Sequence, residues 1–153
     1  MDGAGDFAKK LSFYKPNKRG TGAAMQFDFN EKRECVFLEA ARQQGMEQKF
    51  DWANKMVFKL GVTDIAKILV VLEGKADKAD LFHDPSKSKL AAPGNVKNTA
   101  LNVQKGAGFG YYFKLSMQMA SGSVDAVQLA LSEDEAVLLR VMLKRAVERV
   151  YNW

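Results

Sequence analysis

The sequence predicts an α+β fold in which four antiparallel strands and a helix are followed by four more strands and a second helix. Short runs of alternating apolar and polar residues, separated by turn-forming residues, are typical of antiparallel strands. The period changes to the three-and-four spacing of a helix only after residue 61 and after residue 132. The two halves share no obvious sequence identity, so the predicted duplication is one of architecture.

The composition indicates one ordinary globular domain. The chain has 153 residues, of which 47% are hydrophobic and 27% are charged. We expect residues 1–8, which are rich in Gly, Ala and Asp, to form a flexible arm, and residues 9–153 to form the domain. The longest apolar run, Ile68 to Leu72, is too short to cross a membrane, and no secretory signal begins the chain. The single cysteine, Cys35, excludes a disulfide scaffold.

Alternation predicts four strands in the first half. Phe13 and Lys15 share one face of the first strand, and a basic turn over residues 16–22 separates it from the second. Trp52 and Phe58 are in phase in the fourth strand, which follows a polar loop. The strands are expected over residues 9–15, 23–29, 34–40 and 50–60.

The first helix is predicted over residues 62–74. Ile65, Ile68 and Leu72 recur at helical spacing, as expected for a helix with one buried face. Thr63 is the predicted N-cap, and Gly74 suits the left-handed position that ends many helices.

The second half repeats this order of elements. Its strands are expected over residues 80–83, 96–103, 109–119 and 124–131, with a polar loop over residues 86–95. Ser132 is the predicted N-cap of the last helix, and Glu135 three residues later completes a capping box. Acidic residues at the start of this helix and basic residues near its end match the helix dipole, which supports a helix to about Tyr151.

Basic and aromatic residues are interleaved along several strands, which points to a polyanion with exposed flat rings. A single strand of nucleic acid offers phosphates to cations and base faces to flat side chains, and the net charge of +5 permits such a partner. The predicted contact residues are Lys15, Lys18, Arg19, Met25, Phe27, Trp52, Lys55, Phe58, Lys59, Lys97, Tyr112 and Lys114. The competing interpretation is structural, because strand aromatics more often belong to a core and lysines are more often simply solvated.

Four motifs, in the same order along the chain, resemble the Whirly family of single-stranded nucleic-acid-binding proteins, which are PC4-like. They are Phe-Asp-Trp at residues 50–52, Leu-Phe-His-Asp-Pro-Ser at residues 81–86, the Gly-Phe-Gly-Tyr-Tyr-Phe strand at residues 108–117, and a final helix closing on Asn152-Trp153. The resemblance implies two curved antiparallel four-stranded sheets with two helices, a homotetramer, and binding of single-stranded DNA. It also implies a role in replication, recombination, repair or transcription.

One departure from the family pattern lies at residues 20–25. The family carries Lys-Gly-Lys-Ala-Ala-Leu there, whereas this chain has Gly22 in place of the second lysine, and its basic residues lie upstream. The departure favours a relative from a prokaryote, a phage or an organelle, and therefore an intracellular location. The trypanosomal mitochondrial RNA-binding proteins share the family's fold, so RNA remains a possible ligand.

The sequence offers no arrangement typical of an enzyme. One histidine and one cysteine cannot supply a triad or a structural zinc cluster, and we expect His83 to fix a turn by hydrogen bonds. The glycines at 106, 108 and 110 lead into a strand, whereas a dinucleotide-binding loop opens a helix. No cofactor or metal is expected. The alternatives to a single-strand binder are a protein-interaction module or an RNA-binding chaperone with this fold, and, as a distant third, a metal-dependent nuclease.

Overall fold

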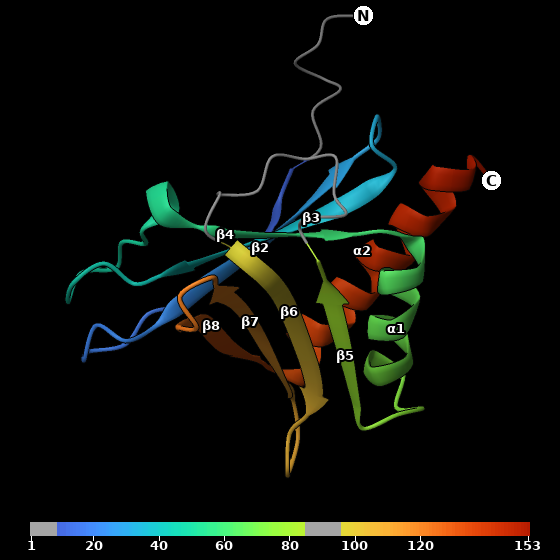
Figure 1. The fold of residues 1–153 in the computed structure, drawn as a ribbon. Coiled ribbons are helices and arrows are strands. Elements are labelled where there is room, and N and C mark those ends of the chain that lie inside the picture. The colour runs from blue at the N-terminus through green and yellow to red at the C-terminus, as the bar shows by residue number, and fades with distance from the viewer. Residues whose placement is uncertain (1–8, 85–95) are drawn as a thin grey trace, which may run out of the picture.

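The computed structural model describes residues 9–84 and 96–153 (Figure 1). The predicted arm at residues 1–8 and the predicted polar loop at residues 86–95 therefore lie outside the described residues. Among the helices in the described ranges, none is both long and apolar enough to span a bilayer.

Two four-stranded antiparallel sheets and two α-helices make up the fold, as the sequence predicted. Sheet 1 has the order β1-β2-β3-β4 and sheet 2 the order β5-β6-β7-β8. The strands of sheet 1 are Leu11–Lys15, Ala23–Asn30, Cys35–Arg42 and Met56–Leu60. Those of sheet 2 are Lys78–His83, Val96–Lys105, Tyr111–Met119 and Val124–Leu131. Helix α1, Val62–Leu72, follows sheet 1, and α2, Glu133–Tyr151, follows sheet 2.

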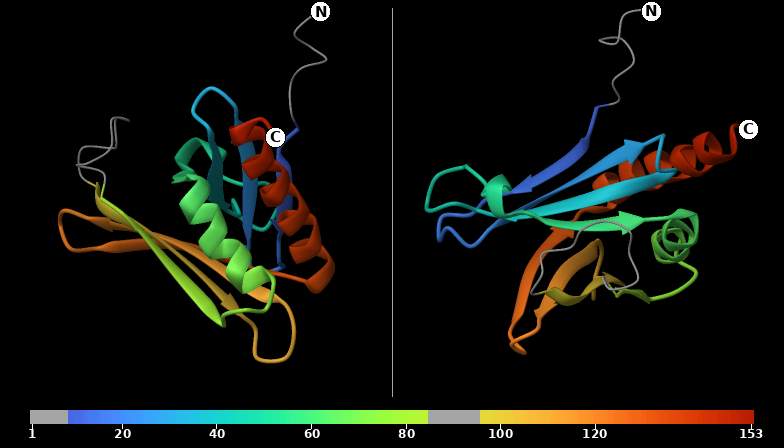
Figure 2. Two further views of the ribbon diagram at one scale, coloured as in Figure 1. Left: turned by 90° about the vertical axis from the view of Figure 1, so that its right-hand side faces the viewer. Right: turned by 45° about the horizontal axis from the view of Figure 1, so that its top comes forward.

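One core joins the two sheets and the helices. The two sheets lie at an angle to each other, and α1 and α2 lie side by side at one end of the molecule (Figures 1 and 2). Phe27 of β2 meets Phe113 of β7 edge to face, with ring centroids 6.2 Å apart. Fully burying one such ring contributes roughly 1.5–3 kcal/mol. The shared core fixes the direction in which the outer faces of both sheets point.

The fourth strand is shorter than predicted. Only Met56–Leu60 forms β4, and Trp52–Asn54 forms a turn of 3-10 helix. Phe50 forms an isolated β-bridge with Gln43. In the turn that follows, the backbone N–H of Asn54 donates to the carbonyl oxygen of Asp51, and the side-chain amide of Asn54 donates to the Asp51 carboxylate. These polar side chains favour a turn over a continuous ladder, so the matching phase of the aromatic residues was misleading.

Helix α1 begins at Val62, as predicted, but its N-cap differs from the predicted one. Gly61 is the N-cap, and the predicted cap Thr63 lies inside the first turn. Asp64, at the third helical position, accepts the Gly61 N–H at 3.1 Å and so satisfies one exposed donor of the helix end. Gly74, with φ of 76°, ends the helix in the left-handed conformation, as predicted.

The first strand of each half contacts the helix of the other half. The predicted capping box of α2 is confirmed, since Glu135 accepts the backbone N–H of Ser132 at 2.9 Å. The same carboxylate pairs with Lys15, the last residue of β1, at 2.5 Å. In the other direction, His83, the last residue of β5, lies 3.2 Å from Asp64 at the start of α1. The two contacts tie the halves together reciprocally.

Candidate nucleic-acid interface

Each sheet turns one face to the core and the other, which we call its open face, away from it. On sheet 1 the open face carries Tyr14, Gln26 and Lys59, in alternation with buried residues such as Phe13, Met25 and Phe58. On sheet 2 it carries Tyr112 and Lys114 in alternation with buried residues of β7. The open faces therefore hold the strand residues that a ligand can reach.

Three predicted contact residues lie in the core, and for them the prediction was wrong. Met25 is 0% exposed, Phe27 5% and Phe58 1%. Each alternates with an outward-pointing neighbour, such as Gln26 beside Met25 or Lys59 beside Phe58. The pleat of the strand sends these three side chains to the core face, where no ligand can contact them.

The side chain of Lys15 also does not lie on the open face. It shares the core-side phase of Phe13, as the alternation predicted, and its ammonium group is occupied by Glu135. Its predicted role as a ligand contact is corrected to a contact between β1 and α2. Lys55 is exposed but pairs with Glu39 at 2.5 Å, so part of its charge is neutralised within the protein.

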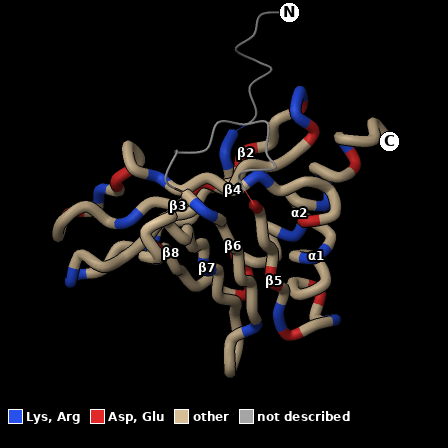
Figure 3. Tube along the Cα trace, in the orientation of Figure 1, with Lys and Arg blue, Asp and Glu red and all other residues tan. Residues whose placement is uncertain are grey.

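The remaining predicted residues are accessible. Trp52 is half-buried, and the exposed ones are Lys18, Arg19, Lys59, Lys97, Tyr112 and Lys114. Lys97 occupies a bulge in β6, between residues 96 and 98. None of the five cations in this set forms an ion pair with another described residue. Along the described part of the trace, lysines and arginines are spread over strands, hairpin ends and helices (Figure 3).

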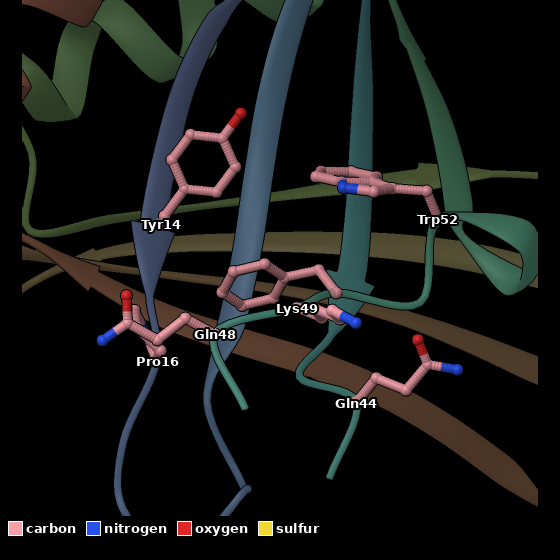
Figure 4. Close-up of a pocket in the computed structure, with 7 residues that line it drawn as sticks. Tyr14, Pro16, Gln44, Gln48, Lys49 and Trp52 are labelled. Carbon is pink, nitrogen blue, oxygen red and sulfur yellow. The ribbon is translucent and has the colours of Figure 1, made fainter. Parts of the chain in front are cut away.

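An aromatic cleft lies at one end of the open face of sheet 1. Its volume is about 550 Å³, and its lining residues are Tyr14, Pro16, Gln44, Gln48, Lys49, Phe50 and Trp52. Tyr14 and Trp52 stand on opposite sides of it (Figure 4), and the ring centroids of Tyr14 and Phe50 are 5.7 Å apart. Flat rings, amides and one ammonium group are the chemistry that a nucleobase and its phosphate require. The sequence-based contact set lacks Tyr14 and Phe50, although alternation with Phe13 already placed Tyr14 on the other face.

Gln43 holds the basic turn and the loop at residues 44–49 together. Its side-chain oxygen accepts the N–H groups of Asn17 and Gly22, at 2.9 and 3.0 Å. Its amide nitrogen donates to the carbonyls of Asn17 and Glu47, at 3.0 and 2.9 Å. Three of these bonds reach residues 17 and 22, far back along the chain, and the fourth holds the adjacent loop at Glu47. No sequence pattern pointed to this residue.

Gly22 explains the departure from the family pattern. A Cβ atom at this position would lie 2.2 Å from the carbonyl oxygen of Lys15 and 2.7 Å from the side-chain oxygen of Gln43. Real contacts of this kind are never so short, so the packing excludes any side chain, including a lysine, at residue 22. The cations of this turn are instead Lys18 and Arg19, which are exposed.

A carboxylate lies in the middle of the open face of sheet 1. Glu39 of β3 is 8% exposed and accepts hydrogen bonds from Lys10 at 2.9 Å, Gln26 at 2.7 Å and Lys55 at 2.5 Å. Burial alone would raise the pKa of Glu39, but the bonds from Lys55, Lys10 and Gln26 outweigh it and lower the pKa to about 2. The acid is therefore ionised at neutral pH and orders two lysines.

His83 is held by the protein itself. Its ring stacks on that of Phe58, with centroids 4.0 Å apart, while its Nε2 faces Asp64. These contacts join β5 to α1 and β4, a longer-range role than the local turn that the sequence suggested. Within the described ranges, no three His, Cys, Asp or Glu side chains gather as metal ligands.

The fold defines a class of duplicated ββββα proteins with known structures. The crystal structure of WHY1 from Arabidopsis thaliana matches with a TM-score of 0.76 and 25% identity, covering 96% of this chain and 87% of that chain. A guide-RNA-binding protein complex bound to its guide RNA shares the fold alone, with a TM-score of 0.71 and 16% identity over 97% of this chain and 94% of that chain.

Within this class, the family can be stated. The family described as Whirly transcription factor matches residues 5–142, so the chain belongs to the Whirly family. Its relatives include the chloroplastic single-stranded DNA-binding protein WHY1 of Arabidopsis thaliana, which is 30% identical over 119 residues, or 77% of this chain and 44% of that protein. The chain spans less than half the length of the curated relatives it matches, at 45%, 29% and 44% for three of them.

Proposed function

We propose that this protein binds single-stranded DNA with little sequence specificity, and that residues 9–153 form one binding domain. The observation that carries the proposal is the combination of exposed rings on the open faces, the aromatic cleft, and open-face lysines such as Lys59 and Lys114 that form no ion pair with another described residue. Relatives named as single-stranded DNA-binding proteins support DNA as the first ligand to test. The RNA-bound protein of the same fold makes RNA the natural competitor.

The chemistry of the interface suits a strand of any sequence. Lys59, Lys97 and Lys114, with Lys18 and Arg19 in the basic turn, would neutralise phosphates and release their counterions. Trp52 and Tyr112 would stack on bases, which tolerates any sequence because every base has a flat face. Lys55 would contribute less, because Glu39 already neutralises part of its charge.

We further propose that the protein is a homo-oligomer, with the family's tetramer as the expected form. Helix α2 buries one apolar side against the core but exposes a second, made of Val137, Leu138, Val141 and Met142, which are 46–55% exposed. Apolar side chains exposed in this number on one helix suit contact with a second copy of the chain. Leu138→Glu should therefore lower the mass measured by sedimentation, whereas Val124→Glu, on the edge strand β8, should leave it unchanged.

The proposed role is in replication, recombination, repair or transcription inside a cell or organelle, without catalysis. Relatives named as chloroplastic and mitochondrial support an organelle matrix, and a prokaryotic or phage-infected cytoplasm offers the same ligand. A nuclease activity would appear as loss of intact oligonucleotide during incubation with magnesium. We expect the oligonucleotide to stay intact.

The test is binding of a labelled single-stranded DNA, followed by fluorescence anisotropy, with duplex DNA and RNA of matched sequence as competitors. We expect tight binding that single strands compete better than duplex. Tyr14→Ala should weaken it, while Tyr151→Ala should not, because Tyr151 is equally exposed but lies at the end of α2 (56% and 61% exposed). Absence of binding to all three nucleic acids at low salt would overturn the proposal and favour a protein-interaction module.

A further inference from the structure

The open face of sheet 1 carries a row of small side chains that begins at an aromatic residue. Tyr14, near the end of β1, pairs with Ala24 of β2, which pairs with Ala41 of β3. Tyr14 is 56% exposed, but the two alanines beside it are 0% and 1% exposed. Side chains from outside the strands must therefore cover this part of the open face.

The loop between β3 and β4 places aromatic rings beside Tyr14. This loop carries Phe50, whose ring lies 5.7 Å from that of Tyr14, and Trp52, which stands on the other side of the cleft (Figure 4). A ring of the protein itself thus lies beside Tyr14, tilted by 40° to it, at a point where the neighbouring strands carry only the methyl groups of alanine. The space is one that an aromatic ring fits.

Sheet 2 carries the same pattern at the equivalent place, where its side chains are exposed or partly exposed. Phe82, near the end of β5, pairs with Ala100 of β6, and the row continues through Ser116 of β7 and Ala126 of β8. We call these four residues the Phe82 row. Phe82 is 65% exposed, and the three small residues are partly exposed. The connection between β7 and β8 spans only residues 120–123, so it supplies no counterpart of Phe50.

We infer that the Phe82 row is a nucleobase-binding site, in which a base of the bound strand takes the place beside Phe82 that Phe50 takes beside Tyr14. The inference rests on the proposed function and adds a specific site to it. A base stacked on the Phe82 ring would rest its edge on the small side chains of the neighbouring strands, which lie about 4.8 Å apart. Long side chains in the row would prevent that approach.

The surroundings of the row suit the rest of a nucleotide. Lys114 is two residues from Ser116 on the same face of β7, about 7 Å along the strand, and forms no ion pair within residues 9–84 and 96–153. It can therefore meet a phosphate while the base lies on the row. Gln128 flanks Lys114 in the same register and offers an amide group to base edges without selecting one base, whereas the amide nitrogen of Asn102 on the other side donates to Asp80 at 2.7 Å.

The test compares Phe82→Ala and Phe82→Leu with the wild-type protein in binding a labelled 30-nucleotide oligo-dT. Both variants should bind about 5- to 150-fold more weakly, because leucine keeps the apolar surface but lacks the flat face. The slope of affinity against salt should stay the same, since no charge changes. Phe109→Ala is the matched control, because Phe109 is an even more exposed ring (81% against 65% for Phe82) at a hairpin outside the row, and it should bind like the wild type.

A ligand-side control uses an abasic oligomer with the same phosphate backbone, which the wild type and Phe82→Ala should bind equally. Wild-type binding of oligo-dT with no loss in the Phe82 variants would overturn the inference and leave the proposed function standing. Failure of the wild type to bind would overturn both. A change of sedimenting mass in Phe82→Leu would also overturn the inference, because the row would then be a contact between copies of the chain.

Discussion

Replacing Gln43 by alanine should loosen the basic turn at a predictable cost in stability. The amide makes four hydrogen bonds of 2.9–3.0 Å, and Gln43 is 7% exposed. At a net 0.5–1.5 kcal/mol for each bond, complete loss would cost roughly 2–6 kcal/mol. The released groups of Asn17, Gly22 and Glu47 lie in surface loops, where water can replace part of the loss. We therefore expect a decrease of about 2–3 kcal/mol in the free energy of unfolding.

Urea unfolding followed by circular dichroism measures this change, with Gln104→Ala as the control. Gln104 is exposed on β6, so its replacement should alter the free energy of unfolding by less than about 0.5 kcal/mol. Binding of single-stranded DNA should also weaken in Gln43→Ala, since Lys18 and Arg19 belong to the turn that Gln43 orders. A variant as stable as the wild type would show that water replaces all four bonds and that Gln43 does not hold the turn.

Two other substitutions separate stability from binding. Glu39→Gln should destabilise the protein by about 1–2 kcal/mol at pH 7. This is less than the full pKa shift of Glu39 would give, because its partner lysines are partly exposed and solvent weakens the ion pairs. Because folding lowers the pKa of Glu39 from 4.5 to about 2, this contribution is present above pH 4.5 and is lost as the pH falls toward 2. The free energies of unfolding of the wild type and Glu39→Gln should therefore become equal in acid. A difference that stays constant with pH would refute the role given to Glu39. Lys15→Met should lower the melting temperature without lowering affinity for DNA, and a selective loss of affinity would return Lys15 to the interface.

The order of strands and helices was predictable because apolar and polar residues alternate along each strand, whereas apolar residues recur every three or four positions in each helix. The same alternation fixed which residues share a face, as with Phe13 and Lys15, but it could not say which face is the core. Both faces of β1 and β7 carry aromatic residues. Alternation places Phe27 of β2 and Phe58 of β4 on one face of their strands without showing which face is the core, so both could be assigned to the ligand as readily as to the core. Only the meeting of the two sheets, through Phe27 and Phe113, decides between the faces.

The parts of the site that the sequence could not predict depend on contacts between distant segments. Gln43 looks like any polar loop residue until residues 17, 22 and 47 are brought around it. The alternation pattern predicts Phe50 as a strand residue, because it is in phase with Phe58. In the structure a turn begins at Asp51, so β4 does not extend to Phe50, and Phe50 lines the aromatic cleft. The Phe82 row likewise needs the register of four strands.

The most direct test of the central claim is the salt dependence of single-stranded DNA binding by the wild type, by Lys59→Gln/Lys114→Gln and by Lys67→Gln. Each phosphate contact contributes about 0.7 to the slope of log affinity against log salt for a single strand. The double variant should therefore lower the slope by about 1.4, because both lysines are on the open faces. Lys67→Gln, which removes one charge from the exposed side of α1, should leave the slope unchanged. Binding that is independent of salt, or an equal loss of slope per charge in all three lysines, would contradict an interface on the open faces.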